Sequence, residues 1–337
     1  DNSKISAITN EKLKIYGLQF HPEVTHTNFG KNIIDNFLFG ICLCKKSWTT
    51  KNIINDSIKN IKNTVKKKKV ILALSGGVDS TVVAALLKKA INKQLTCIFI
   101  DTGLMRKNEV KEVNDNISKK LGIRLITINA QKTFFHKLKG VSSPERKRKI
   151  IGETFIRVFE QQSTKLKNVD FLAQGTIYPD VIESSSKDSK SDIIKSHHNV
   201  GGLPKNMKFD LIEPIRELFK DEVRKIGKSL GIPKSLLERH PFPGPGLAVR
   251  IIGEITKEKV SILQDVDYIF TEELKTANLY TKTGQALSVF LPIKSVGVMG
   301  DKRTYENVIC LRMVTSIDGM TADWFELSHD ILKLCSN

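Results

Sequence analysis

The stretch Val70–Ser80, VILALSGGVDS, decides the expected fold. It opens with five apolar or small residues, which predict a buried strand, and Thr81–Ala90 predicts a helix with Ser80 near its start. The turn between them, Ser75–Ser80, contains two glycines. Glycine lets backbone N–H groups approach a ligand closely, and the first N–H groups of a helix have no partner within it. The sequence therefore predicts an anion-binding turn, to which the hydroxyls of Ser75 and Ser80 add two donors.

This turn contains one acid, Asp79, which we expect to bind Mg²⁺ or to orient the loop, because a carboxylate repels phosphate. The turn is not a Walker loop, since the spacing G-x-x-x-x-G-K-[ST] is absent. SGGVDS resembles instead the pyrophosphate loop of the N-type ATP pyrophosphatases; an ordinary strand–turn–helix connection is the alternative. The resemblance implies that ATP is bound by the loop residues Ser75, Gly76, Gly77, Val78, Asp79 and Ser80.

The composition indicates a globular protein with a strongly basic balance. Of the 337 residues, 54 are Lys or Arg and 36 are Asp or Glu, which gives a net charge of +18. Such a charge suits anionic partners, although we favour the simpler explanation of a lysine-rich chain with solvated side chains. The five cysteines form no disulfide or zinc pattern, no apolar run approaches the ~18–20 residues of a membrane span, and no signal-peptide pattern is present. We therefore expect a cytoplasmic protein with no membrane partner.

Strands and helices alternate from Val70 onward. Further strands are predicted at Leu95–Ile100, Ile123–Ile128 and Asp170–Ala173, and a helix at Glu109–Leu121 that Gly122 ends. This alternation predicts an α/β fold with a parallel sheet covered by helices on both faces. Ligands of such sheets bind beyond the carboxyl ends of the strands. The SGGVDS turn, Asp101 and the loop at Thr176 are therefore expected at one edge.

A polar segment, Ser184–Asp192, follows the fourth predicted strand. It is small, polar and charged, so we expect it to be mobile. Asp180 and Glu183 precede it and Lys195 follows it. A mobile segment flanked by such groups favours an active-site lid, and a surface insertion without a role is the alternative.

The predicted helix Glu217–Leu230 carries Lys220 and Asp221 near its start. A cation at the positive end of a helix dipole suggests an anionic partner, and an exposed surface lysine is the alternative. Arg239–Leu247, RHPFPGPGL, predicts a stiff loop because it contains three prolines and two glycines. Beyond it we expect strands at Val249–Ile252 and Leu287–Val298 and helices at Glu258–Leu274 and Thr321–Leu334. These elements do not alternate strictly, which favours a separate α+β domain.

The first 45 residues predict a strand at Ile15–Phe20 and a helix at Gly30–Phe39, and a further helix is expected at Trp48–Thr64. The string GLQFHPEVTHT resembles the C-terminal part of class I glutamine amidotransferases, which implies that His21 is a general base oriented by Glu23; a surface turn is the alternative. The nucleophilic Cys of such a domain is expected upstream, and no Cys precedes His21 in this sequence. A polypeptide of these residues is therefore expected to use ammonia and not glutamine.

Ten strings between residues 17 and 324, among them SHHNVGGLP and RHPFPGPGL, together resemble the GMP synthetase family. The resemblance implies three parts. They are the tail of a class I glutamine amidotransferase domain at 1–45, an ATP pyrophosphatase domain at 46–244, and a smaller α+β dimerisation domain at 245–337. Both ends of the chain are expected to be incomplete.

The same resemblance implies an activity and its residues. XMP, ATP and ammonia from glutamine would give GMP, AMP and pyrophosphate through an adenyl-XMP intermediate, with Mg²⁺, in a homodimer that has no nucleic-acid partner. Catalytic roles are implied for His21, Glu23, Asp79, Asp180, Glu183, Lys195, Lys220 and Asp221. ATP contacts are implied for the SGGVDS turn, Asp101 and Lys195, and XMP contacts for Arg146, Arg148, Arg239, Pro243, Gly244 and Gln285. An RNA-modifying adenylase with the same loop and a non-catalytic nucleotide-binding module are the alternatives.

Overall fold

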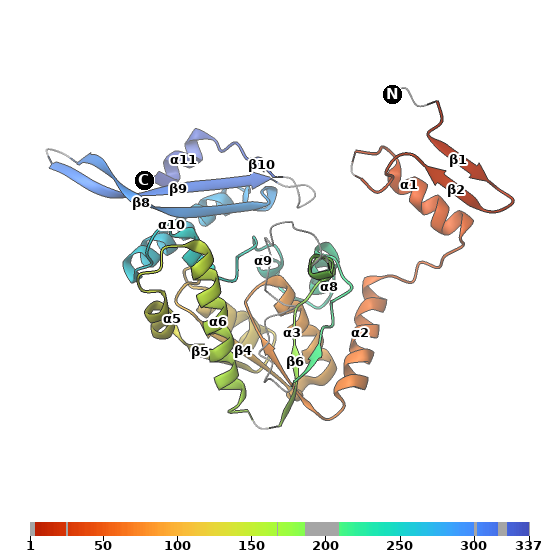
Figure 1. The fold of residues 1–337 in the computed structure, drawn as a ribbon, viewed down its shortest axis with the longest axis horizontal. Helices are drawn as coiled ribbons and strands as arrows, with labels where there is room; N and C mark the ends of the chain where they lie inside the picture. The colour runs from red at the N-terminus through yellow and green to blue at the C-terminus, as the bar shows by residue number, and fades with distance from the viewer. Residues whose placement is uncertain are drawn as a thin grey trace. The chain divides into compact units, whose positions relative to one another are not determined.

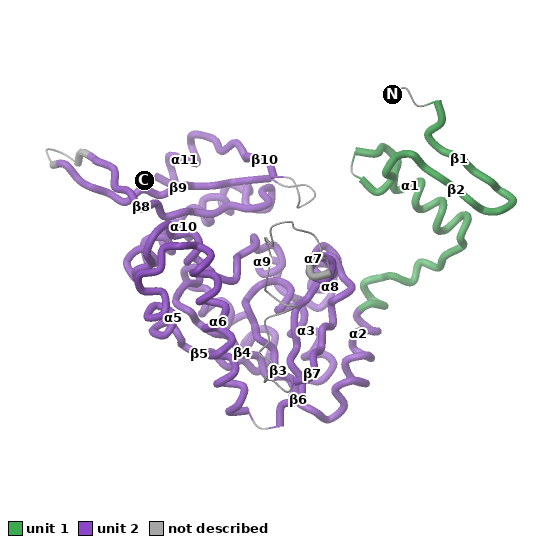
Figure 2. Tube along the Cα trace, in the orientation of Figure 1, with its two compact units in different colours: residues 1–53 green, residues 54–337 purple. Residues whose placement is uncertain are grey.

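The computed structural model describes residues 4–24, 26–166, 168–185, 209–299, 302–315 and 322–336. The chain divides into two compact units, residues 1–53 and 54–337, and each is described by itself (Figure 2). No helix among the described residues is long and apolar enough to cross a membrane.

The first unit contains an antiparallel hairpin and one helix. Strands β1 (Ala7–Asn10) and β2 (Ile15–Leu18) pair from Ala7↔Leu18 to Asn10↔Ile15. Helix α1 (Gly30–Asp35) continues as the π-helical segment η1 (Asn36–Ile41). The predicted strand and helix are both present, whereas the polar sequence of β1 did not predict its pairing with β2.

A five-stranded parallel sheet forms the centre of the second unit (Figure 1). Its order is β5-β4-β3-β6-β7. The strands are β3 (Lys69–Ala73), β4 (Leu95–Asp101), β5 (Leu125–Asn129), β6 (Val169–Ala173) and β7 (Asp210–Ile212). The chain leaves β3 toward β4 and β5 and then returns to place β6 on the other side of β3, so the strand order reverses between β3 and β6. In open α/β sheets, ligands bind at such a reversal.

Helices cover both faces of this sheet, as predicted (Figure 1). Helices α5 (Gln131–Leu138) and α6 (Pro144–Ser163) pack against each other and share one core cluster with Ile71, Ile98 and Ile100 of the strands. Helices α3 (Val78–Ile91) and α8 (Lys220–Ser229) pack against each other. The remaining helical segments are α2 (Thr50–Val65), η2 (Asn92–Gln94), α4 (Glu109–Val113), η3 (Asn114–Lys120), α7 (Tyr178–Ser185) and α9 (Lys234–Leu237).

An antiparallel sheet of order β10-β9-β8 follows the parallel one in sequence. Its strands are β8 (Gln285–Met299), β9 (Lys302–Thr315) and β10 (Asp323–Trp324). Helix α10 (Lys257–Thr276) packs on β8 and on α11 (His329–Ser336), and η5 (Tyr280–Lys282) precedes β8. This mixture of strands and helices agrees with the predicted α+β character.

Two predicted elements of this region were wrong. The strand expected at Val249–Ile252 is instead the 3-10 helix η4 (Gly246–Arg250), followed by an isolated bridge between Ile251 and Phe290. Gly246 has a φ of 63°, and a Cβ there would lie 2.3 Å from the carbonyl oxygen of Leu104, so a close approach sets this turn. The helix expected at Thr321–Leu334 begins only at His329, because β10 pairs with β9 before it.

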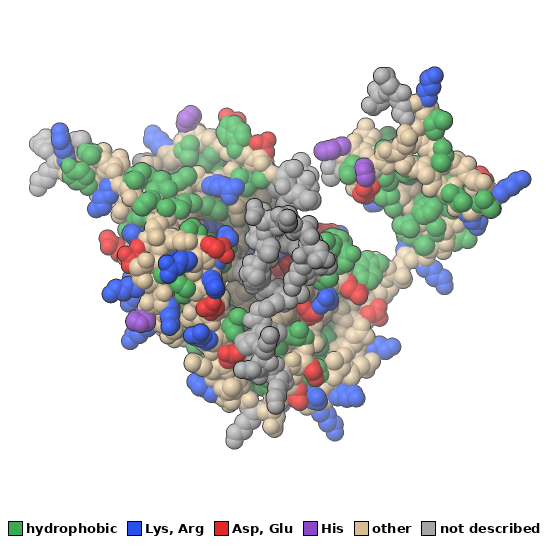
Figure 3. Space-filling model, in the orientation of Figure 1, with side chains coloured by type: hydrophobic (Ala, Val, Ile, Leu, Met, Phe, Trp, Pro, Cys, Tyr) green, Lys and Arg blue, Asp and Glu red, His purple; other side chains and the backbone are tan. Residues whose placement is uncertain are grey.

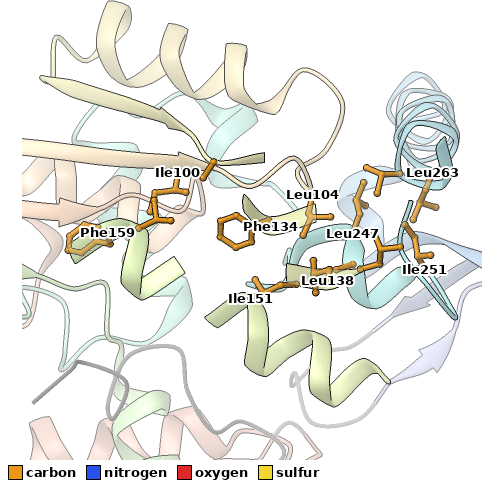
Figure 4. Packing of buried hydrophobic residues seen from close by; sticks show 14 of the residues in the cluster. Ile100, Leu104, Phe134, Leu138, Ile151, Phe159, Leu247, Ile251 and Leu263 are labelled. Atoms are coloured by element: carbon orange, nitrogen blue, oxygen red, sulfur yellow. The ribbon is translucent and has the colours of Figure 1, made fainter. Parts of the chain in front are cut away.

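The core of the parallel sheet continues into the segment that follows η4. Figure 4 shows Leu247, Ile251 and Leu263 in one cluster with Phe134 and Ile151. The predicted boundary at residue 245 therefore falls inside a shared hydrophobic core, and the division into the three domains stays a prediction.

Candidate active site

The SGGVDS turn lies at the carboxyl end of β3, where the strand order reverses. Helix α3 begins at Val78, with extended Gly77 before it, and not at Thr81 as the sequence predicted. Val78, Asp79 and Ser80 therefore form the first turn of the helix. In the described part of the chain, no acceptor takes the backbone N–H groups of these three residues. They are the donors that a phosphate group would use at the positive end of a helix dipole.

Two serines fix the shape of the turn. The Ser80 hydroxyl donates to the carbonyl oxygen of Gly77 at 3.1 Å and lies 3.0 Å from the Ser75 hydroxyl. The Ser75 Oγ accepts the N–H of Gly77 at 3.3 Å. Gly76 has a φ of 77°, a left-handed conformation that favours glycine. The turn is therefore organised before a ligand binds.

The loop after β6 touches the start of α3. A Cβ at Gly175 would lie 3.2 Å from the backbone nitrogen of Ser80 and 3.3 Å from the carbonyl carbon of Asp79. Beside it, the buried Thr176 hydroxyl donates to Glu213 at 2.5 Å. The two loops that flank the strand reversal are thus packed together, as expected for the turn and the Thr176 loop.

Asp79 forms an ion pair with Lys220. The Lys220 Nζ lies 2.7 Å from Oδ1 and 2.5 Å from Oδ2 of Asp79, and both side chains are partly exposed. Lys220 is the first residue of α8, so Asp79 is an anionic partner of the kind that the sequence suggested for it. Asp221, the next residue, is exposed and pairs with Lys225 of the same helix at 3.1 Å.

Asp101 is buried at the end of β4 and fixes its own loop. Its carboxylate accepts the N–H of Gly103 at 2.9 Å and the side-chain amide of Gln131 at 2.7 Å. It also borders a hollow of about 560 Å³ whose wall includes Arg106 and Lys257. None of the SGGVDS residues lines this hollow.

Arg239 is held by two acids and by the SGGVDS turn. Its guanidinium, 13% exposed, lies 3.2 Å from Glu109 Oε1 and 3.4 Å from the carbonyl oxygen of Gly76, and it also pairs with Glu112. Glu109 is itself buried. The role of Arg239 as an XMP contact stays a prediction.

The other predicted XMP contacts lie on three elements. Arg146 and Arg148 are exposed near the start of α6, where Arg148 lies 3.7 Å from Glu145. Gln285 begins β8, and its Oε1 accepts from Arg312 at 3.2 Å. In the loop before η4, Pro243 is half-buried and Gly244 is exposed.

Most of the predicted lid lies outside the described residues, and Lys195 lies outside them too. Ser184 and Ser185 end helix α7, and residues 186–192 are not described. Asp180 lies in the first turn of α7, where its Oδ2 accepts the N–H of Ile177 at 3.0 Å. Glu183 belongs to the same helix.

His21 and Glu23 lie side by side in the first unit. The Nδ1 of His21 is 2.8 Å from Oε1 of Glu23, and both side chains are exposed. Hydrogen bonds from the Glu23 backbone and from His21 lower the pKa of the Glu23 carboxyl. This arrangement can orient an imidazole, as the sequence led us to expect.

Sequence reasoning missed several residues that organise the site. Glu109 and Glu112, the partners of Arg239, carry no motif of their own. Lys147, between the two predicted arginines, is fully buried and donates to the carbonyl oxygens of Ala248 at 3.2 Å and Ile251 at 2.7 Å. Burial lowers its pKa to about 8. The spacing of α6 could have shown that one lysine of PERKRK faces inward.

The described residues contain no cluster of three or more His, Cys, Asp or Glu side chains that could hold a metal ion. At the turn, Asp79 supplies one carboxylate, and Lys220 occupies both of its oxygens. Mg²⁺ is commonly held by one or two carboxylates together with substrate phosphates. The donor set therefore fits Mg²⁺ only if ATP brings phosphate oxygens to it.

Three family models match separate stretches of the chain. The family model for the class-I glutamine amidotransferases matches residues 1–41, that for NAD synthase matches residues 50–151, and that for the GMP synthase C terminal domain matches residues 272–337.

Glutamine-hydrolysing GMP synthases align with almost every residue. The protein of Cellvibrio japonicus is 58% identical over 334 residues, 99% of this chain and 64% of its own length. The protein of Fusobacterium nucleatum is 56% identical over 100% of this chain, and that of Thermosipho melanesiensis is 58% identical over 99% of it. The chain covers 66% of the length of each of these two proteins. The chain thus spans slightly less than two thirds of these relatives, and it belongs to the family of glutamine-hydrolysing GMP synthases.

Proposed function

We propose that this protein is a ligase that aminates XMP to GMP with ATP, through an adenyl-XMP intermediate, and releases AMP and pyrophosphate. The proposal is supported by identity of 56–58% to GMP synthases over nearly the whole chain. The observation that carries it is the SGGVDS turn, whose N–H groups at Val78–Ser80 have no acceptor in the described chain and lie at the strand reversal.

The residues of the turn are suited to the first chemical step. The 2-oxygen of XMP attacks the α-phosphate of ATP, and the bond to the β-phosphate breaks so that pyrophosphate leaves with the electron pair. Negative charge grows on this leaving group. Preorganised N–H donors at the start of α3 stabilise such charge, and Lys220, held by Asp79, adds a cation beside them.

The second step replaces the adenylate. Ammonia attacks C2 of the purine, the bond from C2 to the bridging oxygen breaks, and AMP leaves with that oxygen. Ammonia would come from glutamine in the whole protein, where His21 and Glu23 would serve as base and orienter. When bound with ATP, Mg²⁺ would supply charge neutralisation at the phosphates, with Asp79 as its protein ligand.

We also propose a cytoplasmic homodimer. Apolar side chains gather on the β8–β9 hairpin, as Figure 3 shows. Ile293, Val296 and Tyr305 are 57%, 57% and 62% exposed there. Such a patch favours contact with another protein surface, and a second copy of this chain is the partner that the dimerisation domain of the family implies. Sedimentation of wild type against Val296→Asp tests this, and a wild-type monomer at micromolar concentration contradicts it.

The activity is tested by product analysis with XMP, ATP and ammonium chloride. We expect GMP, AMP and pyrophosphate in equal amounts, and no pyrophosphate when XMP is left out. Formation of ADP and phosphate would contradict the adenylate. Release of pyrophosphate with tRNA and not with XMP would favour the RNA-modifying adenylase instead.

A further inference from the structure

His240 is buried where three segments of the second unit meet. Its backbone N–H donates to the Tyr280 hydroxyl at 2.9 Å, and its ring stacks on the Tyr280 ring with centroids 3.8 Å apart. Its carbonyl oxygen accepts from Arg106 at 3.3 Å. The side chain thus contacts Tyr280, which precedes β8. The backbone is held by Arg106, which lies in the loop after β4.

The hydrogen bonds of the ring fix its tautomer. The N–H of Ala286 donates to Nδ1 at 3.2 Å, so Nδ1 carries a lone pair. The other nitrogen, Nε2, lies 2.7 Å from the carbonyl oxygen of Tyr280 and therefore carries the proton. Burial lowers the pKa of His240, which agrees with a neutral ring. Both nitrogens are used within the protein, so the ring is not a free acid or base.

The residues on either side of these contacts belong to the two halves of the site. Arg239, which precedes His240, donates to the carbonyl oxygen of Gly76 in the phosphate-binding turn. Ala286, which donates to the His240 ring, follows Gln285, the proposed XMP contact at the start of β8. Two consecutive residues therefore connect the ATP loop with the strand that carries Gln285.

The loop that carries His240 makes further contacts at Phe242. The Arg106 guanidinium lies 4.3 Å from the centre of the Phe242 ring, and the buried Arg250 lies 5.1 Å from the same ring. Arg250 in turn donates to Asp267 of α10 at 3.0 Å. The same Asp267 oxygen accepts the N–H of Ser288 of β8 at 3.3 Å, so these contacts connect the loop at Phe242 with α10 and with β8 beyond its first residues.

We propose that His240 is a positioning residue for XMP, which holds the start of β8 and Gln285 at a set place relative to the phosphate-binding turn. This inference rests on the proposed function. It differs from a role in folding alone, because it concerns one substrate. Loss of the bond to Ala286 displaces the XMP contact while the SGGVDS turn, which the serines hold, keeps its shape.

Two substitutions separate the hydrogen bonds of the ring. His240→Phe keeps the ring and its stacking on Tyr280 but removes both hydrogen bonds. His240→Asn keeps an acceptor near the Nδ1 position, because Oδ1 of Asn is the same number of bonds from the backbone. His136→Phe, at an exposed position of α5, is the matched control.

Steady-state kinetics with ammonia and the full-length protein test the inference, with melting temperatures measured in parallel. We expect His240→Phe to raise the KM for XMP by about tenfold, because the N–H of Ala286 at the start of β8 loses its buried acceptor, without changing the KM for ATP. His240→Asn and His136→Phe should keep the wild-type KM for XMP. If His240→Phe does not fold, His240→Leu, which also removes both hydrogen bonds of the ring, takes its place in the same comparison with His240→Asn.

Equal rises in both KM values, an unchanged KM for XMP in His240→Phe, or a tenfold rise in His240→Asn would overturn the role of His240. Absence of GMP formation by the wild-type protein would instead refute the proposed function. The two failures are therefore distinguishable in one set of assays.

Discussion

Asp79 and Lys220 lie in the first turns of two different helices, 141 residues apart in the sequence, and form an ion pair at the SGGVDS turn. The pair is partly exposed, at 28% and 39% of the side chains, so solvent screens it and its contribution to stability is small. Its location beside the unpaired N–H groups of α3 points to a role in charge placement instead. The turn could be predicted from SGGVDS, whereas this contact could not, because no local pattern connects residues so distant.

Asp79→Asn should lower turnover by about 100- to 1000-fold, because it removes the carboxylate that holds the Lys220 cation, and would hold Mg²⁺, beside the leaving group. The melting temperature should change little. Asp115→Asn is the control, because Asp115 pairs within its own helical segment, where its Oδ1 lies 2.6 Å from the Nζ of Lys119. Wild-type turnover in Asp79→Asn would remove this carboxylate from the mechanism.

The pKa of Lys147 predicts a dependence of stability on pH. Its pKa is about 8 in the folded protein, against 10.5 for an unperturbed lysine. Between these values the unfolded chain binds the extra proton, so the free energy of unfolding rises with pH, by up to about 3 kcal/mol. Below pH 8 both states are protonated and the contribution is constant.

Denaturant unfolding of wild type and Lys147→Met from pH 7 upward measures this effect. The difference in unfolding free energy, wild type minus variant, should increase above pH 8. Lys149→Met, at an exposed position of the same helix, should show a flat difference. A wild-type advantage that falls with rising pH would show that Lys147 is not held as described.

At the scale of elements, the loops after β3 and β6 form the site by packing against each other. Gly175 permits this contact, since an added Cβ would lie 3.2 Å from the Ser80 nitrogen. Gly175→Ala should therefore raise the KM for ATP by about tenfold through displacement of the Ser80 N–H. Gly152→Ala, in α6 with open space around it, should keep activity and gain roughly 0.5–1 kcal/mol of stability. An unchanged KM for ATP in Gly175→Ala would show that the loop after β6 does not position the N–H groups that bind ATP.

The elements that could be predicted are those with a strong local pattern. The apolar runs of β3 and β4 are buried on both faces, and the sequence predicted the ends of both strands to within one residue. Val249–Ile252 was predicted as a strand, but its first two residues end η4, because Gly246 packs against Leu104. A tertiary contact decided this segment, and no window of the sequence contains it. The polar β1 was missed for the same reason, since its pairing with β2 is not local.

At the scale of the whole molecule, every described group assigned to the synthetase reaction lies in the second unit. A polypeptide of residues 46–337 keeps helix α2 intact and should form GMP from ammonia at the rate of the 337-residue chain. Circular dichroism checks its folding, and GMP formation is followed in parallel. A folded but inactive protein would show that residues 1–45 contribute to the synthetase site.

The most direct test of the central claim follows one oxygen atom. XMP that carries oxygen-18 on C2 is incubated with the protein, ATP and ammonium chloride, and AMP and pyrophosphate are analysed by mass spectrometry. If the 2-oxygen attacks the α-phosphate at the SGGVDS turn, the label passes to AMP, one atom for each GMP formed, and pyrophosphate stays unlabelled. Label that appears in water or in pyrophosphate would contradict the adenyl-XMP intermediate and the role assigned to the turn.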